Sequence, residues 1–165
     1  AAQSLDEVLN ICNAQYFTNG LESFYSLQDN SVDMIVSQAV LEHIRKDEFL
    51  VIMQECQRIM SENGVSVHTI DLKDHLSKAL NNLRFHHNFW ESEFISSSGF
   101  YTNRIRYSKM LEIFEHAGFS MSIISKNTWD ELPTPRKRIA HPFNLLTDDE
   151  LCVSEFTVLL NHAKL

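Results

Sequence analysis

Two histidines and two aspartates lie close together in the middle of the sequence. His68, Asp71, Asp74 and His75 fall at the end of an alternating apolar segment. Imidazole and carboxylate groups can take a proton from a hydroxyl or an amine, and they are also metal ligands. The same residue types can instead cap a turn between a strand and a helix. Neighbouring strand residues point to opposite faces, so His68 and Asp71 do not converge easily, and we predict no metal site. The acid/base role and the turn role both stay open.

A second polar group follows a short apolar segment. Residues 32–36 are apolar apart from Asp33, and a turn precedes them, which predicts a buried strand. Ser37, Gln38 and Ala39 come directly after it. Ligands of open α/β sheets bind just beyond the carboxyl ends of the strands, so we expect these three residues to contact a cofactor.

Two amphipathic helices are the clearest elements that could position these groups. Residues 47–62 and 107–117 repeat apolar side chains at spacings of three and four, which gives each helix one apolar face. Asn63–Gly64 and Gly118 follow them, and such residues tolerate the positive φ with which many helices end. Shorter helices are predicted over 4–12 and 76–85, with a capped helical turn over 147–150.

Strands are predicted between these helices. Alternating or continuous apolar residues indicate strands over 65–72, 119–126 and 154–161, and a short one over 14–18. Helices alternating with strands indicate an α/β fold. Residues 73–106 form a helical and aromatic insertion in this pattern.

The overall composition limits the possible partners. The 165 residues suit one domain, and 14 basic against 22 acidic residues give a net charge of −8, which argues against a nucleic-acid surface. No apolar run approaches the ~18 residues that span a membrane, and no signal peptide is visible. The three cysteines are odd in number and widely spaced, so they predict no disulfide framework. We expect a cytoplasmic protein that binds neither nucleic acid nor membrane.

Three segments resemble one enzyme family. Residues 31–44, Ser-Val-Asp-Met-Ile-Val-Ser-Gln-Ala-Val-Leu-Glu-His-Ile, resemble the fourth strand and following turn of class I S-adenosylmethionine-dependent methyltransferases of the type 11 group. Residues 58–64 resemble the family's turn before strand five, and 117–119 resemble the Ala-Gly-Phe before strand six. The sequence contains no Gly-x-Gly, so the family's glycine-rich loop is absent. The chain therefore resembles the C-terminal two-thirds of such an enzyme, a single partial domain over residues 1–165.

The resemblance implies a fold and a cofactor. It implies a Rossmann-like class I methyltransferase sheet that is N-terminally incomplete and mostly parallel, with an antiparallel last strand between strands five and six. It also implies S-adenosylmethionine as cofactor and a small-molecule methyl acceptor, either a small metabolite or a glycan precursor. The residues expected to contact the cofactor are Leu21 and Glu22, beside the adenine ring, with Ser37, Gln38 and Ala39.

The remaining expected site residues face the methyl acceptor. We predict that His43, Asp74 and His75 are catalytic. Arg104 and Arg106, at alternate positions, could hold a carboxylate or phosphate, or could pair with acids such as Asp71, Asp74 or Glu91 and fix the insertion. The predicted substrate-binding residues are His68, Asp71, Asn103, Arg104 and Arg106.

Two functions from different classes remain. One is the C-terminal part of a methyltransferase; the other is a non-catalytic Rossmann-like fragment that self-associates or binds a protein partner. Without the glycine-rich loop the chain alone is expected to bind cofactor weakly or not at all and to be inactive. The strand over 32–36 would have an unpaired edge, so we predict a homodimer across it or coverage by residues 14–18.

Overall fold

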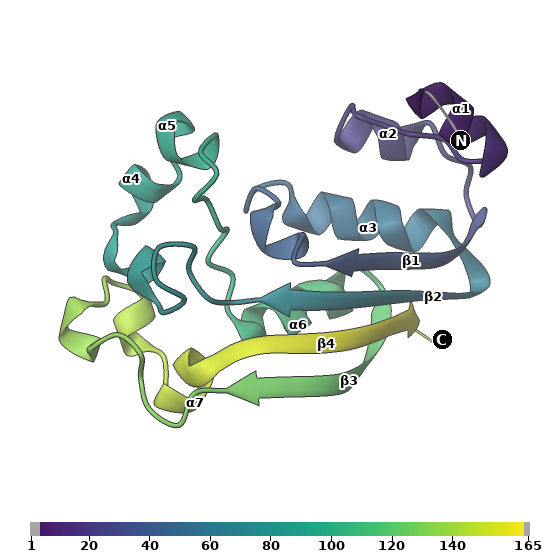
Figure 1. Ribbon diagram of the computed structural model, residues 1–165. Coiled ribbons are helices and arrows are strands. Elements are labelled where there is room, and N and C mark those ends of the chain that lie inside the picture. The colour runs from purple at the N-terminus through teal and green to yellow at the C-terminus, as the bar shows by residue number, and fades with distance from the viewer. Residues whose placement is uncertain (1–3, 164–165) are drawn as a thin grey trace.

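The computed structural model describes residues 4–163 and contains a four-stranded sheet (Figure 1). The order across the sheet is β1-β2-β4-β3. β1 and β2 are parallel, whereas β4 runs antiparallel to both of its neighbours, β2 and β3. The predicted mostly parallel α/β sheet, with an antiparallel last strand inserted between strands five and six, is confirmed. The strands are β1 (Val32–Gln38), β2 (Met60–Asp71), β3 (Phe119–Thr128) and β4 (Val153–His162).

Parallel pairing brings the carboxyl ends of β1 and β2 to the same edge of the sheet. Ser37 of β1 lies opposite His68 of β2, and Gln38 lies opposite Thr69. These two strands are joined by α3 (Phe49–Ile59), as expected for a parallel crossover. The polar residues that end both strands therefore lie side by side.

Two helices pack on one face of the sheet. α3 buries Phe49 and Met53, and α6 (Tyr107–His116) buries Met110 and Phe114. These side chains join one hydrophobic core with residues of β2 and β4. Burying each large apolar side chain contributes roughly 1.5–3 kcal/mol, so the two predicted helix faces supply much of the stability. Gly118 ends α6 with φ +95°, as predicted.

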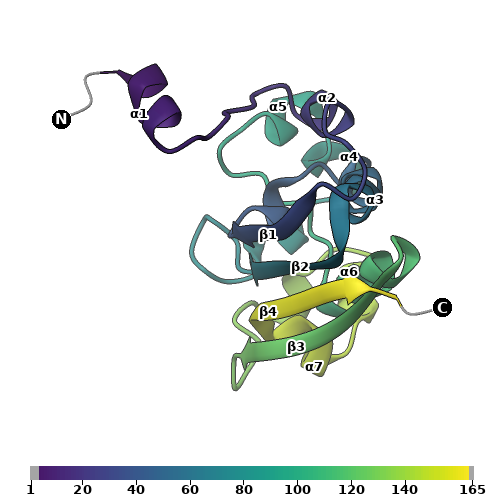
Figure 2. The same cartoon turned by 90° about the vertical axis from the view of Figure 1, so that its right-hand side faces the viewer.

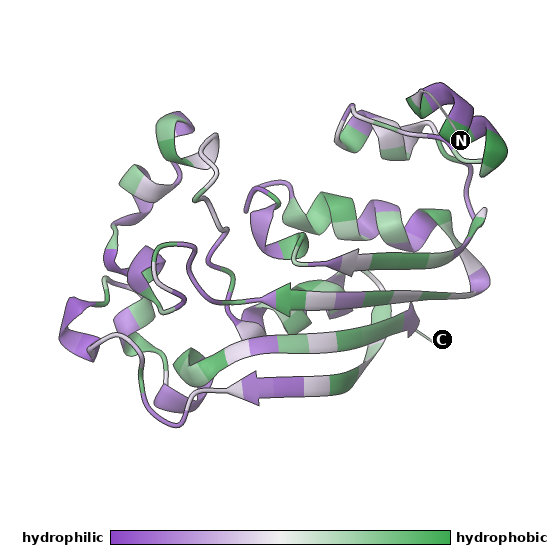
Figure 3. Cartoon of the chain, in the orientation of Figure 1, coloured by the Kyte–Doolittle hydropathy of each residue, from purple (hydrophilic) through white to green (hydrophobic). Residues whose placement is uncertain are grey.

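The opposite face of the sheet is open in the described part of the chain. Figure 2 shows α3 and α6 on one side of the strands, whereas on the other side only α1 is drawn, and it stands away from the strands. Met34 and Val36 are 60% and 63% exposed, and Ile124 of β3 is 60% exposed. The prediction that residues 32–36 are fully buried is therefore wrong, because a strand is buried only where other elements cover it. Figure 3 shows that much of this exposed β1 ribbon is nonetheless hydrophobic.

The predicted strand over residues 14–18 is also wrong. These residues form an exposed connection between α1 (Leu5–Ile11) and α2 (Leu21–Tyr25), so the outer edge of β1 is unpaired among residues 4–163. The Ser4 side chain caps α1, yet α1 buries none of its residues and stands apart from the sheet in Figure 2. Of these two N-terminal helices, only α2 contacts the hydrophobic core, through Phe24.

The predicted helix over 47–62, ended by Asn63–Gly64, is wrong at its C-terminal end. The helix ends at Ile59, and Asn63–Gly64 already lies within β2. Gly64 has no positive φ; a Cβ there would lie 2.6 Å from Met60 Cγ and 2.9 Å from the Ser61 carbonyl oxygen. The glycine permits a close backbone approach where the β1–β2 register shifts.

The insertion after β2 consists of turns and short helices, so the predicted helix over 76–85 is wrong. The Asp74 carboxylate accepts hydrogen bonds from the backbone N–H groups of Leu76 and Ser77 at 2.9 and 2.7 Å. A side chain that binds nearby backbone in this way competes with helix formation. The short elements of the chain are η1 (Leu41–His43), η2 (Asn81–Arg84), α4 (His87–Trp90), α5 (Glu93–Ser96), η3 (Arg136–Arg138), η4 (Phe143–Leu145) and α7 (Asp148–Cys152).

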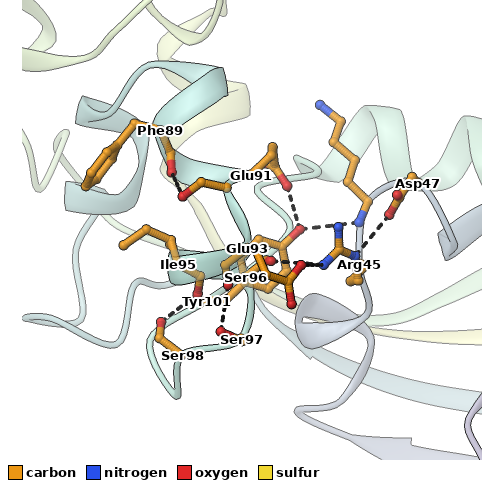
Figure 4. A network of polar contacts seen from close by, with 12 residues as sticks. Arg45, Asp47, Phe89, Glu91, Glu93, Ile95, Ser96, Ser97, Ser98 and Tyr101 are labelled. Atoms are coloured by element: carbon orange, nitrogen blue, oxygen red, sulfur yellow. Dashed lines mark hydrogen bonds and ion pairs between the residues drawn. The ribbon is translucent and has the colours of Figure 1, made fainter.

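Arg45 joins the insertion to the segment before α3 (Figure 4). Its guanidinium donates to Ser96 Oγ at 2.9 Å and lies 3.4 Å from Glu93 and 3.5 Å from Asp47. These side chains are mostly exposed, so each ion pair contributes little to stability. Together they place α5 beside η1 and the carboxyl end of β1.

Candidate functional site at the carboxyl ends of the first two strands

The chain turns sharply where β1 ends. The Ala39 backbone N–H donates to the Thr69 carbonyl oxygen at 2.9 Å, which extends the pairing with β2 by one residue. Ala39 has φ +51°, a left-handed conformation that is rare for a residue with a Cβ. Such strain is common at functional sites. Gln38 and Ala39 are exposed at the end of β1, whereas the Ser37 side chain is partly buried, and contact of the three residues with a cofactor stays a prediction.

His68 binds two serine hydroxyls beneath this edge. Its Nδ1 lies 2.7 Å from Ser37 Oγ, and its Nε2 lies 2.6 Å from Ser66 Oγ. The ring is buried, and burial lowers the pKa of His68 to about 4. A neutral imidazole has one donor and one acceptor nitrogen, and a serine hydroxyl can satisfy either. The three residues thus join β1 to β2, with both ring nitrogens occupied.

His43 and His75 come together above the strand ends. Their ring centroids are 4.8 Å apart, with the rings edge to face. His43 Nδ1 lies 2.8 Å from the Tyr101 carbonyl oxygen, which can only accept a hydrogen bond. In the neutral ring the proton is therefore on Nδ1, and Nε2 is the basic nitrogen. This pair unites two of the three predicted catalytic residues, which lie far apart in the sequence.

The two aspartates of the His68–His75 segment bind nearby groups. Asp74 is buried, and its carboxylate also accepts from the backbone N–H and the side-chain amide of Asn81. Asp71 accepts from the Lys73 backbone N–H at 2.8 Å and pairs with the Lys73 ammonium at 2.9 Å. Both carboxylates order the turn that carries His75, which is itself exposed.

Glu42 is a buried carboxylate that was not among the predicted site residues. It is 2% exposed, and burial raises its pKa. One oxygen accepts a hydrogen bond of 3.3 Å from the Asp71 backbone, and Oε2 has no hydrogen-bond partner among the described residues. The sequence contained one signal for this burial: Glu42 lies between the apolar residues Leu41 and Ile44. A carboxylate in such a segment is either buried with its apolar neighbours or directed toward solvent.

Glu91 connects the predicted site residue Arg104 to Tyr101. It pairs with Arg104 at 3.1 Å and accepts a 2.7 Å hydrogen bond from the Tyr101 hydroxyl (Figure 4 shows the second). Burial raises the pKa of Tyr101, and the Glu91 charge acts in the same direction. Burial lowers the pKa of Arg104, against the effect of Glu91. Of the three acids expected to pair with the arginines, Glu91 pairs with Arg104, whereas Asp71 pairs with Lys73 and Asp74 binds nearby backbone N–H groups.

Asn103 and Arg106 bind backbone carbonyl groups. Asn103 Nδ2 donates to the carbonyl oxygens of Leu41 and Ile44, at 2.8 and 3.0 Å. The Arg106 guanidinium donates to the carbonyl oxygens of Leu72 and Val153, at 2.9 and 2.6 Å. Burial lowers the pKa of Arg106 to about 10. These side chains fasten the insertion to the sheet, and the substrate-binding role of Asn103, Arg104 and Arg106 stays a prediction.

Gln38 is exposed at the end of β1, and its amide can donate and accept hydrogen bonds. Glu22 is exposed on α2, which packs against α3, and its carboxylate can accept from hydroxyl or amino groups. The cofactor-binding role of these residues stays a prediction. Leu21 precedes Glu22 at the start of α2, after Gly20 with φ +53°. In residues 4–163 no three His, Cys, Asp or Glu side chains are placed to hold a metal ion. None of the helices in that range is long and apolar enough to cross a bilayer.

Comparison with known proteins gives a family match for part of the chain. Residues 2–68 match the family described as "Methyltransferase domain", of type 11. No curated protein sequence matches the chain.

Solved structures share the fold. The YcgJ protein from Bacillus subtilis has a TM-score of 0.54 at 12% identity, over 96% of this chain and 77% of its own. PigF with SAH has a TM-score of 0.51 at 16% identity, over 96% of this chain and 43% of its own. The chain thus has the Rossmann-like fold of class I S-adenosylmethionine-dependent methyltransferases, and its first part matches their type 11 domain family.

Proposed function

We propose that this chain is the part of an S-adenosylmethionine-dependent methyltransferase that carries strands four to seven, acting on a small molecule or glycan precursor. The observation that carries this proposal is the parallel β1–β2 pair, because the segments that follow its two carboxyl ends bring His43 and His75 into contact. In this proposal the chain is a single partial domain over residues 1–165 with an insertion at about 73–106. Its proposed location is the cytoplasm.

Each residue at the edge has a task in this proposal. S-adenosylmethionine, when bound, supplies an electrophilic methyl group. Leu21 packs on the adenine and Glu22 accepts from its polar groups, while Ser37, Gln38 and Ala39 form the wall at the end of β1. The wall orients the cofactor and excludes water, and displacement at a methyl group needs little more than such positioning.

The histidine pair handles the acceptor's proton. His43 Nε2 takes a proton from the acceptor hydroxyl or amine, because Nδ1 is engaged by the Tyr101 carbonyl. His75 lies against His43 and faces solvent, so it can pass that proton outward. Asp74 orders the turn that holds His75. His68, Asp71, Asn103, Arg104 and Arg106 act on the acceptor side of the site by holding the strand ends and the insertion in place, because each already binds another protein group.

Calorimetry with S-adenosylhomocysteine tests the cofactor site on this chain. We expect weak saturable binding, because this sequence lacks the glycine-rich loop that supplies backbone N–H groups in this fold. Gln38→Ala should weaken it about fivefold, as expected for losing one hydrogen bond in a polar site. Gln28→Ala, an exposed glutamine in the turn before β1, is the control and should bind like the wild type. Absence of saturable binding, or equal effects of the two variants, would contradict the proposal.

We also propose that the chain forms a homodimer through the free edge and open face of β1. The exposed apolar Met34 and Val36 support this, since an unpaired apolar edge strand favours pairing with another chain. Sedimentation analysis should give a dimer that Val36→Lys converts to monomer. Leu145→Lys changes an exposed leucine far from β1 and should leave the dimer intact. A wild-type monomer at all concentrations would refute the homodimer.

A further inference from the structure

A cavity of about 610 Å³ lies beside the N-terminal half of α6. Segment 104–106 forms one wall, and segment 142–147 forms another. None of Leu21, Glu22, Ser37, Gln38, Ala39, His43 or His75 lines it, although it shares Arg104 and Arg106 with the predicted substrate-binding residues. Its volume is within the ~300–1,000 Å³ that is typical of small-molecule sites.

Most of the cavity wall is apolar. Ile105 and Ile113 contribute from the α6 side, and Phe143, Leu145 and Leu146 contribute from the facing segment. Leu145 is 73% exposed, so an apolar ligand would remove a large leucine surface from water. Such walls suit a hydrocarbon or aromatic body.

The charges around the cavity favour an anionic group on that body. Glu112 pairs with Lys109 at 2.6 Å, and Glu150 accepts from the Ser108 backbone N–H at 2.9 Å, so both acids are already engaged. The Lys46 ammonium, in contrast, has no ion-pair partner in residues 4–163. A free cation at an apolar cavity stands out in a chain of net charge −8.

Two buried arginines add to the positive charge. Arg104 and Arg106 line the cavity, each 4% exposed, and Glu91 already pairs with Arg104 at 3.1 Å. The Arg104 guanidinium lies 5.1 Å from the Phe143 ring centroid, which holds that aromatic wall in place. We propose that this cavity binds a small amphipathic acid, with its apolar body against Phe143 and Leu146 and its carboxylate toward Lys46.

Titration with decanoate, decanol and decyltrimethylammonium tests this ligand class, because the three differ in head-group charge on one apolar chain. Amide NMR shifts should map decanoate to residues 104–113 and 142–147. Lys46→Gln should weaken decanoate about fivefold, the effect of losing one ion pair, and leave decanol unchanged. Lys137→Gln removes a lysine of η3 outside the cavity and should have no effect.

The open sheet face is the competing site for an alkyl chain. Shifts at Met34 and Val36 in place of the cavity residues, or equal binding of decanoate and decanol, would overturn the proposal. Cofactor binding plays no part in this titration, so its outcome is independent of the proposed methyltransferase function.

Four unsatisfied polar atoms carry a second, independent inference. Among the described residues, these are the buried side-chain atoms without a hydrogen-bond partner: Glu42 Oε2, Asn82 Oδ1, Arg104 Nε and Arg106 Nε. All four residues line the same small cavity of about 10 Å³. That volume is about what one water molecule needs.

The chemistry of these atoms matches water. The two arginine Nε–H groups donate, and the two oxygens of Glu42 and Asn82 accept. A water molecule accepts two hydrogen bonds and donates two, whereas an anion would leave the oxygens unpaired and a cation would leave the N–H groups unpaired. We infer that one ordered water occupies this cavity and joins η1, the insertion and the start of α6.

A crystal structure at atomic resolution and water ¹⁷O relaxation dispersion test this inference. Density for one water within reach of the four atoms is expected, and Asn82→Leu should remove one long-lived water from the dispersion. Asn88→Leu makes the same change at an exposed position of α4 and should remove none. An empty cavity in the wild-type density would refute the inference, even if Asn82→Leu fails to fold.

Discussion

His68 shows how one residue links the candidate site to the stability of the protein. Its imidazole bridges Ser37 and Ser66 while buried, so protonation would place a charge where water cannot reach it. The same hydrogen bonds hold the carboxyl end of β1 against β2. The wall on which the cofactor is proposed to lie therefore depends on His68 being neutral.

We predict that acid weakens folding through His68. Its folded pKa is about 4 against an ordinary value of 6.5, so the unfolded chain binds the proton first as the pH falls. Its contribution is complete above pH 6.5 and is lost as the pH falls toward 4, a change of roughly 2–3 kcal/mol between pH 7 and pH 4.5. Chemical denaturation of the wild type and of His68→Gln at both pH values measures it. An equal loss in the two proteins would contradict the prediction.

At the scale of elements, the close approach in β2 depends on one glycine. A Cβ at Gly64 would meet Met60 and the Ser61 carbonyl, and backbone cannot move aside as easily as a flexible side chain. Gly64→Ala should lower the free energy of unfolding by about 1–3 kcal/mol. Gly99→Ala is the matched control, because nothing lies within 4 Å of a Cβ there. Thermal unfolding of both variants decides the question, and a Gly64→Ala protein as stable as the control would contradict it.

Elements with a strong repeating pattern could be predicted from the sequence. The apolar faces of α3 and α6 and the alternation in β4 predicted both type and position, because each pattern reflects packing against the same core. The strand over 14–18 failed because its alternation is short and the segment stays exposed, so within residues 4–163 it pairs with no strand, not even with the free edge of β1. The helix over 76–85 failed because the Asp74 side chain takes the backbone N–H groups that begin a turn.

The candidate site could be predicted only in part. Ser37, Gln38 and Ala39 could be placed at the strand end from the chain pattern alone. The approach of His43 to His75 could not, because it depends on η1 and on the turn at Asp74 meeting in space. The unpartnered atoms of Glu42 and Asn82 likewise emerge only when the insertion folds back on the sheet.

At the scale of the whole molecule, helices cover one face of the sheet and leave the other face open in the described part of the chain. α3 and α6 cover one face, while Met34, Val36 and Ile124 remain exposed on β1 and β3 (Figure 2). The carboxyl edge with its histidine pair, the apolar cavity beside α6 and the open face are three separate surfaces. Cofactor binding, binding of an amphipathic acid and self-association can therefore be tested independently.

The most direct test of the central claim is amide NMR of the chain titrated with S-adenosylhomocysteine. The claim is that the end of β1 is a wall of the cofactor site. Saturating shifts should centre on Gln38 and Ala39 and extend to Leu21 and Glu22. Binding that shifts other residues and leaves Gln38 and Ala39 unchanged would contradict the account.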